Sequence, residues 1–141
     1  MKKTALFFLL AVFVCPLTQA SECTQEKAEA AEKAVDNLKT WAAVYESYMR
    51  YSSCDEGSIG EGYSEVIIRL LVDRGSELPT LDALGKRNAS FGRWVLSHID
   101  STLGSDDLQK VSDTAKTQCP PGHVALCKEI VVAASEAINK G

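Results

Sequence analysis

Apolar residues recur three and four positions apart in the N-terminal part of the chain. They are Ala31, Val35, Leu38, Ala42, Tyr45 and Met49. This spacing places all of them on one side of a helix. It predicts one long amphipathic helix over residues 24–51, with one face buried and the opposite face charged.

The next apolar segment predicts the central helix of the fold, from Asp55 to about Arg74. The Asp55 carboxylate can cap its start, and Gly75 can end it in the left-handed conformation. A helix that is apolar on nearly every side is usually buried, and this segment carries Ile59, Tyr63, Val66, Ile67, Ile68, Leu70, Leu71 and Val72. The β-branched run at residues 66–68 also fits a strand, but no second strand-like run is there to pair with it.

Four more helices are predicted in the second half of the chain. Pro79 fits the first turn of a helix over residues 78–85, and Asn88 can cap the next one. Ser105 is the expected cap of a further helix, with acidic residues in its first turn, and the last helix follows the Pro120-Pro121-Gly122 turn. The sequence therefore predicts an all-α fold, a single compact domain of five or six helices with two disulfides.

The first 20 residues have the pattern of a secretory signal peptide. Lys2 and Lys3 precede an apolar run over residues 5–14, and small residues occupy the expected cleavage site at Ala20. The run is shorter than the roughly 18 residues that a membrane span requires. We expect residues 1–20 to be a signal peptide and residues 21–141 to form a helical periplasmic domain.

The charge of that domain narrows the classes of partner. Losing Lys2 and Lys3 leaves 13 basic side chains against 19 acidic ones, a formal net charge of −6. An acidic surface repels nucleic acid and anionic lipid. The sequence therefore predicts neither nucleic-acid binding nor membrane binding after signal cleavage.

Four cysteines remain in the domain: Cys23, Cys54, Cys119 and Cys127. An even number in a secreted chain predicts disulfides, and the absence of a Cys-x-x-Cys pair argues against zinc. A single helix over residues 24–51 would hold its ends about 40 Å apart, so Cys23 with Cys54 is the least expected pair. Cys119 with Cys127 is a possible local bridge. Crossed pairs, joining Cys23 and Cys54 each to one of Cys119 and Cys127, leave no free thiol and are favoured, provided that the Ala/Glu-rich start of the first helix bends or frays.

Ser97, His98 and Asp100 contain the residue types of a hydrolase triad. Neighbours on one helix do not converge as nucleophile, base and orienting group must. We therefore interpret His98 as a helix-surface histidine that packs near Trp94 or Thr102. With His123 as the only other histidine, the sequence predicts a protein that is not an enzyme and needs no cofactor.

Acidic residues and glycines are concentrated in residues 54–63. The spacing of the acids does not fit a calcium loop, and no P-loop lysine accompanies the glycines. One interpretation is that the glycines permit close helix packing beside a disulfide. The functional interpretation is an exposed acidic tip, with Asp55, Glu56 and Glu61 as partner-binding residues that dock into a basic cleft of a protein.

The combination of several features resembles a known family. They are the signal peptide, Cys54-Asp55-Glu56-Gly57 before the central helix, the stretch Trp94-Val95-Leu96-Ser97-His98-Ile99-Asp100, and Cys119-Pro120-Pro121-Gly122 with Cys127. In architecture and cysteine placement the chain resembles the immunity proteins that neutralise peptidoglycan amidases delivered by type VI secretion. The resemblance implies a non-catalytic periplasmic inhibitor whose partner is a peptidoglycan hydrolase. A periplasmic stress or chaperone-like protein is the alternative.

Overall fold

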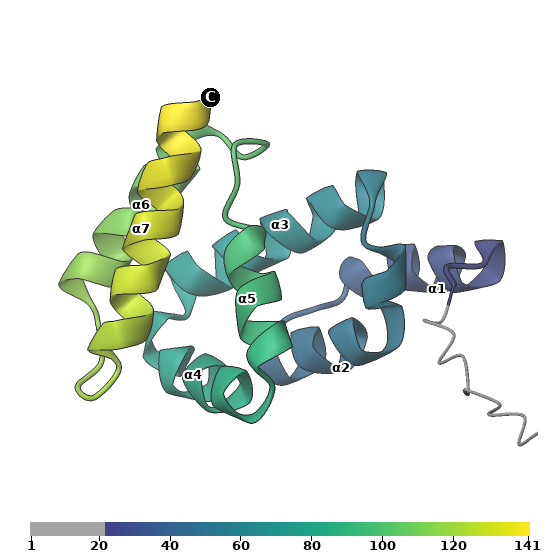
Figure 1. Cartoon of the computed structure of the whole chain (residues 1–141), viewed down its shortest axis with the longest axis horizontal. Helices are drawn as coiled ribbons and strands as arrows, with labels where there is room; N and C mark the ends of the chain where they lie inside the picture. The colour runs from purple at the N-terminus through teal and green to yellow at the C-terminus, as the bar shows by residue number, and fades with distance from the viewer. Residues whose placement is uncertain (1–21) are drawn as a thin grey trace, which may run out of the picture.

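The computed structural model describes residues 22–141, which form helices joined by short connections (Figure 1). The predicted signal peptide, residues 1–20, lies outside this part of the chain. None of the described helices is long and apolar enough to cross a bilayer. The described residues contain no strand, and their elements are α1 (Gln25–Val35), α2 (Trp41–Tyr51), the 3₁₀ turn η1 (Ser52–Cys54), α3 (Gly57–Asp73), the 3₁₀ turn η2 (Gly75–Glu77), α4 (Leu78–Arg87), α5 (Ala89–Ser97), α6 (Ser105–Thr117) and α7 (Val124–Lys140). The all-α prediction is confirmed, with seven α-helices in place of five or six.

The single long helix predicted over residues 24–51 is wrong, because the chain breaks between α1 and α2. Asn37 follows the end of α1, where its side-chain amide donates to the carbonyl of Lys33 at 3.0 Å. Thr40 begins α2: its backbone is extended, and its hydroxyl accepts a hydrogen bond from the N–H of Ala43. Side chains that bond to the nearby backbone in this way compete with helix continuation.

The break also changes which side chains are buried. Ala31, Val35 and Leu38 lie in the core as predicted, but Ala42 and Met49 are exposed. The buried side chains of α2 are instead Trp41, Val44 and Ser47. A helical phase extrapolated across the break therefore assigns the wrong face of α2 to the core.

The two disulfides are Cys23–Cys54, which joins the start of α1 to the turn after α2, and the local bridge Cys119–Cys127. The crossed pairing is wrong, because Cys23 with Cys54 was disfavoured on the assumption of an unbroken first helix. With the break, α1 and α2 fold back on one another, and the Cα atoms of Cys23 and Cys54 lie 5.0 Å apart. At the other bridge, Gly122 adopts a φ of +85° and reverses the chain between the two cysteines.

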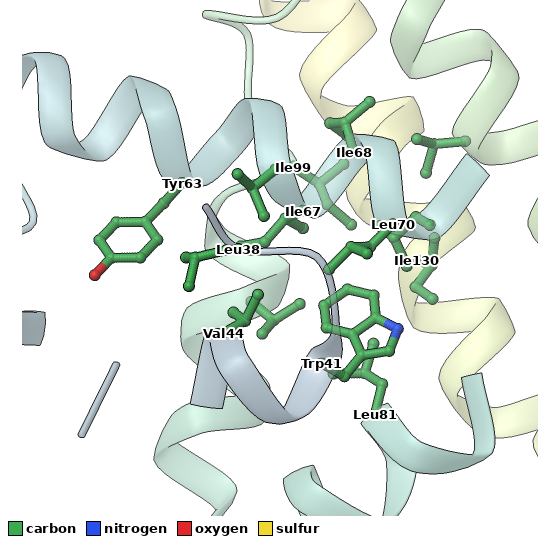
Figure 2. Packing of buried hydrophobic residues seen from close by; sticks show 14 of the residues in the cluster. Leu38, Trp41, Val44, Tyr63, Ile67, Ile68, Leu70, Leu81, Ile99 and Ile130 are labelled. Atoms are coloured by element: carbon green, nitrogen blue, oxygen red, sulfur yellow. The ribbon is translucent and has the colours of Figure 1, made fainter. Parts of the chain in front are cut away.

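Helix α3 is the central helix, as the sequence predicts. It packs against α1 on one part of its surface and α6 on another, while α6 and α7 pair along their lengths (Figure 1). Figure 2 shows Ile67, Ile68 and Leu70 of α3 among side chains from other helices, with Trp41 of α2 close to Leu81 of α4. Burial of these side chains against several helices holds the domain together.

The start and end of α3 differ from their predictions. Its N-cap is Glu56, which makes no side-chain capping bond, so Asp55 is not the cap. Gly57, at the first position, has a φ of +54°, a left-handed conformation that glycine adopts without steric cost. The prediction for Gly75 is also wrong, because Gly75 is buried in η2 and has no positive φ. The turn at Gly57 leaves the Asp55 side chain free for another role.

The caps of the later helices agree with the sequence in part. Asn88 caps α5, with its side-chain oxygen accepting from the N–H groups of Ser90 and Phe91. Ser105 is the first residue of α6 and not its cap, which is Gly104. Asn88 brings α5 back across α4, and α5 ends at the candidate site.

Candidate functional site

His98 links three segments of the chain below the surface. It follows the end of α5 and is only 6% exposed. Its Nδ1 lies 2.9 Å from the hydroxyl of Ser64 on α3, and its Nε2 lies 3.0 Å from Oδ2 of Asp55. The imidazole packs edge-on against Trp94 with ring centroids 4.5 Å apart. The expected contact with Trp94 is present, but the prediction of a surface position is wrong.

Asp55 accepts two hydrogen bonds from α5 and the residue after it. The indole N–H of Trp94 donates to Oδ2 at 2.6 Å, and His98 contacts the same oxygen. Burial raises the pKa of Asp55, but the hydrogen bond and charge of His98, together with the Trp94 hydrogen bond, outweigh burial and hold the pKa below its ordinary value. Asp55 is therefore an ionised acceptor at neutral pH, fixed to α5 by charge-assisted hydrogen bonds.

Ser64, His98 and Asp55 contain the residue types of a hydrolase triad, but their arrangement does not suit nucleophilic attack. Ser64 is only 2% exposed, so its hydroxyl offers little surface to a substrate carbonyl. It lies within α3, where backbone N–H groups are used in helical hydrogen bonds and cannot form an oxyanion hole. Its hydroxyl is also 3.2 Å from the carbonyl oxygen of Gly60, one turn earlier. These contacts join α3 to α5, and they do not present a nucleophile.

Above this buried network lies a surface depression of about 370 Å³, here called the acidic hollow. Its ionisable lining residues are Asp55, Glu56, Glu61, His98 and Asp100. Of the residues that the structure describes, no lysine or arginine lines it. Glu56 and Glu61 are exposed. The three predicted partner-binding residues therefore lie together, with Glu56 and Glu61 available to a partner and Asp55 held from below.

The two other residues of the sequence-derived triad have separate roles. Asp100 lines the acidic hollow, and its Oδ1 accepts from the N–H and hydroxyl of Thr102. Its Oδ2 lies 3.5 Å from the Ser64 hydroxyl. The Ser97 hydroxyl donates to the carbonyl of Trp94 at 2.7 Å, so it satisfies its own helix. His98 thus contacts a serine and an aspartate, but from distant positions in the chain.

His123 occupies a second, more exposed ion-pair site at the start of α7. Its Nδ1 lies 2.7 Å from Oδ2 of Asp82, which also accepts from Lys86 at 2.7 Å. The Lys86 hydrogen bond is the main reason that the pKa of Asp82 falls below its ordinary value. The contact joins α4 to α7. No group of three or more metal-ligating side chains comes together within residues 22–141.

Sequence reasoning missed Ser64 and the hydrogen bond from Trp94 to Asp55. Ser64 is a small polar residue on a helix that is otherwise apolar on nearly every side, and a buried hydroxyl needs a hydrogen-bond partner. That exception in the pattern was a usable signal, but it could not identify the partner. Trp94 was expected to lie beside His98, but its bond to Asp55 joins residues 39 apart in the chain.

Comparisons with known proteins give no relative. No protein-family model, curated protein or solved structure matches this chain significantly.

Proposed function

We propose that this protein is a non-catalytic binding protein that inhibits a protein partner through the acidic hollow. The partner that we propose is a secreted cell-wall amidase, which makes this chain an immunity protein in the sense of the type VI secretion systems. The observation that carries the proposal is that two exposed carboxylates, Glu56 and Glu61, lie beside Asp55, whose side chain is held in place by hydrogen bonds from below. Charged groups in such a position speed encounter with an oppositely charged surface and select against other partners.

The rigidity of the segment at Asp55 favours a role in partner binding over that of a merely solvated acidic surface. Asp55 is tied to both Trp94 and His98, and the Cys23–Cys54 disulfide ends at the residue just before it. A segment fixed in this way loses little conformational entropy when a partner binds. Glu56, the next residue, is therefore presented from a nearly fixed backbone.

We propose the periplasm as the compartment, reached through the predicted signal peptide. Two disulfides indicate an oxidising environment. The pattern of residues 1–20 supports export through a bacterial inner membrane. An immunity protein against a peptidoglycan amidase would need this location, because the substrate of the amidase lies there.

The chaperone-like alternative has less support. Holding unfolded clients requires a sizeable apolar surface. The large apolar side chains that are most exposed among the described residues are Met49 on α2 and Val124 and Val132 on α7. Met49 lies apart from the two valines, which are both on α7 and line one apolar depression with Cys127 and Val131. The exposed apolar side chains of α2 and α7 therefore do not join into one large surface.

The test measures inhibition directly. Secreted cell-wall hydrolases encoded near this gene are purified and assayed on peptidoglycan with and without an equimolar amount of the protein. We expect one of them to lose activity. The double variant Glu56→Lys with Glu61→Lys should bind that enzyme about tenfold more weakly or worse, because like charges then face one another.

The matched control reverses two exposed glutamates that do not line the acidic hollow. Glu129→Lys with Glu136→Lys changes the net charge equally, on exposed positions of α7. It should leave inhibition unchanged. If both double variants weaken binding equally, net charge and not the acidic hollow determines affinity. If a folded, monomeric protein inhibits none of the hydrolases, the proposed function is wrong.

A further inference from the structure

The hydrogen bonds of His98 fix which ring nitrogen carries a proton when the ring is neutral. The Asp55 carboxylate is ionised and can only accept, and it lies 3.0 Å from Nε2. Nε2 therefore carries hydrogen. The bare Nδ1 then accepts the hydroxyl proton of Ser64, 2.9 Å away. In this state the Ser64 hydroxyl points at the imidazole and away from its other neighbours.

A second proton on the ring reverses the bond to Ser64. Once Nδ1 also carries hydrogen, it donates to the Ser64 oxygen, and the hydroxyl proton must turn elsewhere. Two acceptors lie within reach: the carbonyl oxygen of Gly60 at 3.2 Å and Oδ2 of Asp100 at 3.5 Å. Both states satisfy the polar atoms of the network, which a buried site requires. The network therefore accommodates either charge of His98 without breaking.

We propose that His98 is a proton-dependent switch of the acidic hollow, whose ring charge sets the direction of the Ser64 hydroxyl and the net charge offered to a partner. The neutral ring leaves all the carboxylates of the hollow uncompensated. The protonated ring places a positive charge beside Asp55 and directs the Ser64 hydroxyl toward Gly60 and Asp100. This inference rests on the proposed function for its effect on binding, but the switch itself exists without a partner.

The groups that face His98 come from each segment packed on it. Asp55 precedes α3 and contacts the ring directly, and Asp100 reaches it through Ser64. Tyr63 of α3 lies with its ring centroid 5.8 Å from that of His98. Glu56 and Glu61 line the same hollow. Four of these five groups are carboxylates, so a charge on the ring would lie among negatively charged groups.

Protonation of His98 should weaken the binding of a cationic partner. A partner that offers cationic side chains meets one more positive charge when His98 is protonated. Its affinity should then fall as the pH falls, by about fivefold, the low end of the usual coupling between two sites. Histidine is the side chain that ordinarily changes charge between about pH 5 and 8. The periplasm is open to external protons, so this range is physiologically relevant there.

The first experiment uses the protein alone. Nitrogen-15 NMR of the imidazole rings is followed between about pH 8 and pH 5, where histidine ordinarily titrates. At the high end we expect His98 to be neutral with hydrogen on Nε2, and at the low end to carry hydrogen on both nitrogens. Carbon-13 signals of the Gly60 carbonyl and the Asp100 carboxylate should move together with the ring.

Three variants separate the switch from a general effect of pH. Ser64→Ala removes the hydroxyl, so the ring should still titrate while the Gly60 signal no longer follows it. His98→Gln keeps a donor and an acceptor in place of the ring and should abolish the response of Asp100. The control His123→Gln removes the other histidine and should leave the response at Gly60 and Asp100 intact.

The second experiment measures partner affinity at the two ends of the same pH range. The fivefold loss at low pH should disappear in His98→Gln and persist in His123→Gln. The switch is overturned if neutral His98 carries hydrogen on Nδ1, if the ring stays neutral throughout, or if Gly60 and Asp100 do not follow it. These NMR outcomes need no partner, so they are independent of whether the proposed function fails.

Discussion

A Cβ atom placed on Gly62 would lie 2.6 Å from Cγ1 of Val35. Helices α1 and α3 thus approach so closely that only a hydrogen atom fits between them at this point. Val35 is 5% exposed and has little freedom to move aside. The glycine of α3 therefore determines how near α1 can lie.

Gly62→Ala should lower the free energy of unfolding by about 1–3 kcal/mol, the usual result of overpacking a filled core. Urea unfolding measures the change. Gly75→Ala is the control, because Gly75 has no positive φ and its Cβ would meet Cγ2 of Thr114 at an ordinary 3.5 Å. Adding Val35→Ala to Gly62→Ala should recover part of the loss. If the double variant loses as much free energy of unfolding as the two single variants together, the contact between Val35 and residue 62 is not the cause of the loss.

Asp55→Asn should destabilise the fold and remove part of its acid sensitivity. The pKa of Asp55 is lowered in the folded state, so its contribution is fully present above the unfolded value of about 3.9 and is lost as the pH falls through the folded value. Near neutral pH the variant should lose about 1.5–3 kcal/mol, the worth of a hydrogen bond to a charged group.

The measurement for Asp55→Asn is urea unfolding of both proteins from neutral pH down into the acid range. The difference in the free energy of unfolding between wild type and Asp55→Asn should shrink as Asp55 becomes protonated at low pH. Asp113→Asn, an exposed position on α6, should follow wild type. A difference that stays constant at every pH would contradict the role of the ionised carboxylate.

The two disulfides should contribute unequally to stability. Cys23 and Cys54 are separated by 31 positions, and Cys119 and Cys127 by 8. Loop-closure entropy then gives about 3.7 kcal/mol for the first bridge and about 2.5 kcal/mol for the second. Replacing each pair by alanine and measuring urea unfolding should reproduce this order, and the reverse order would contradict it.

Tyr63 should ionise at a higher pH than an ordinary tyrosine. Burial raises its pKa above the ordinary value, opposed in part by the hydrogen bond with Ser47, at 2.7 Å. Stability that depends on neutral Tyr63 is present below the unfolded pKa of about 10 and is lost as the pH rises toward the folded value. An alkaline absorbance titration should show a late step that is missing in Tyr63→Phe. The same substitution should lower the free energy of unfolding by about 1–2 kcal/mol, because it leaves the Ser47 hydroxyl unpaired.

The parts of the fold that the sequence predicted correctly depend on short-range signals. The apolar surface of α3 follows from spacings within one helix, and Asn88 caps α5 through bonds to residues two and three positions away. The break before α2 shows the limit of such signals. Asn37 and Thr40 were visible in the sequence, but the apolar spacing continues across them, so periodicity alone extended the helix.

The wrong prediction of one continuous helix also led to the wrong prediction of the disulfide pairs. Cys23 with Cys54 was unfavourable only for a straight helix, and the fold-back of α2 on α1 makes it the observed pair. Whether a chain continues or reverses at such a point depends on the long-range burial of Leu38 and Trp41. Local propensity does not contain that information.

The sequence by itself determined the helical class, the acidic balance of charge and the residues at which partner binding is proposed. Only the tertiary structure decided that His98 meets Ser64 and Asp55, which lie 34 and 43 positions away. The physical reason is that a buried polar atom must find a hydrogen-bond partner, and the packing of α3 against α5 decides which partner is near. The acidic residues of the hollow could be identified from their closeness in the sequence, but the hydrogen-bond network beneath them could not.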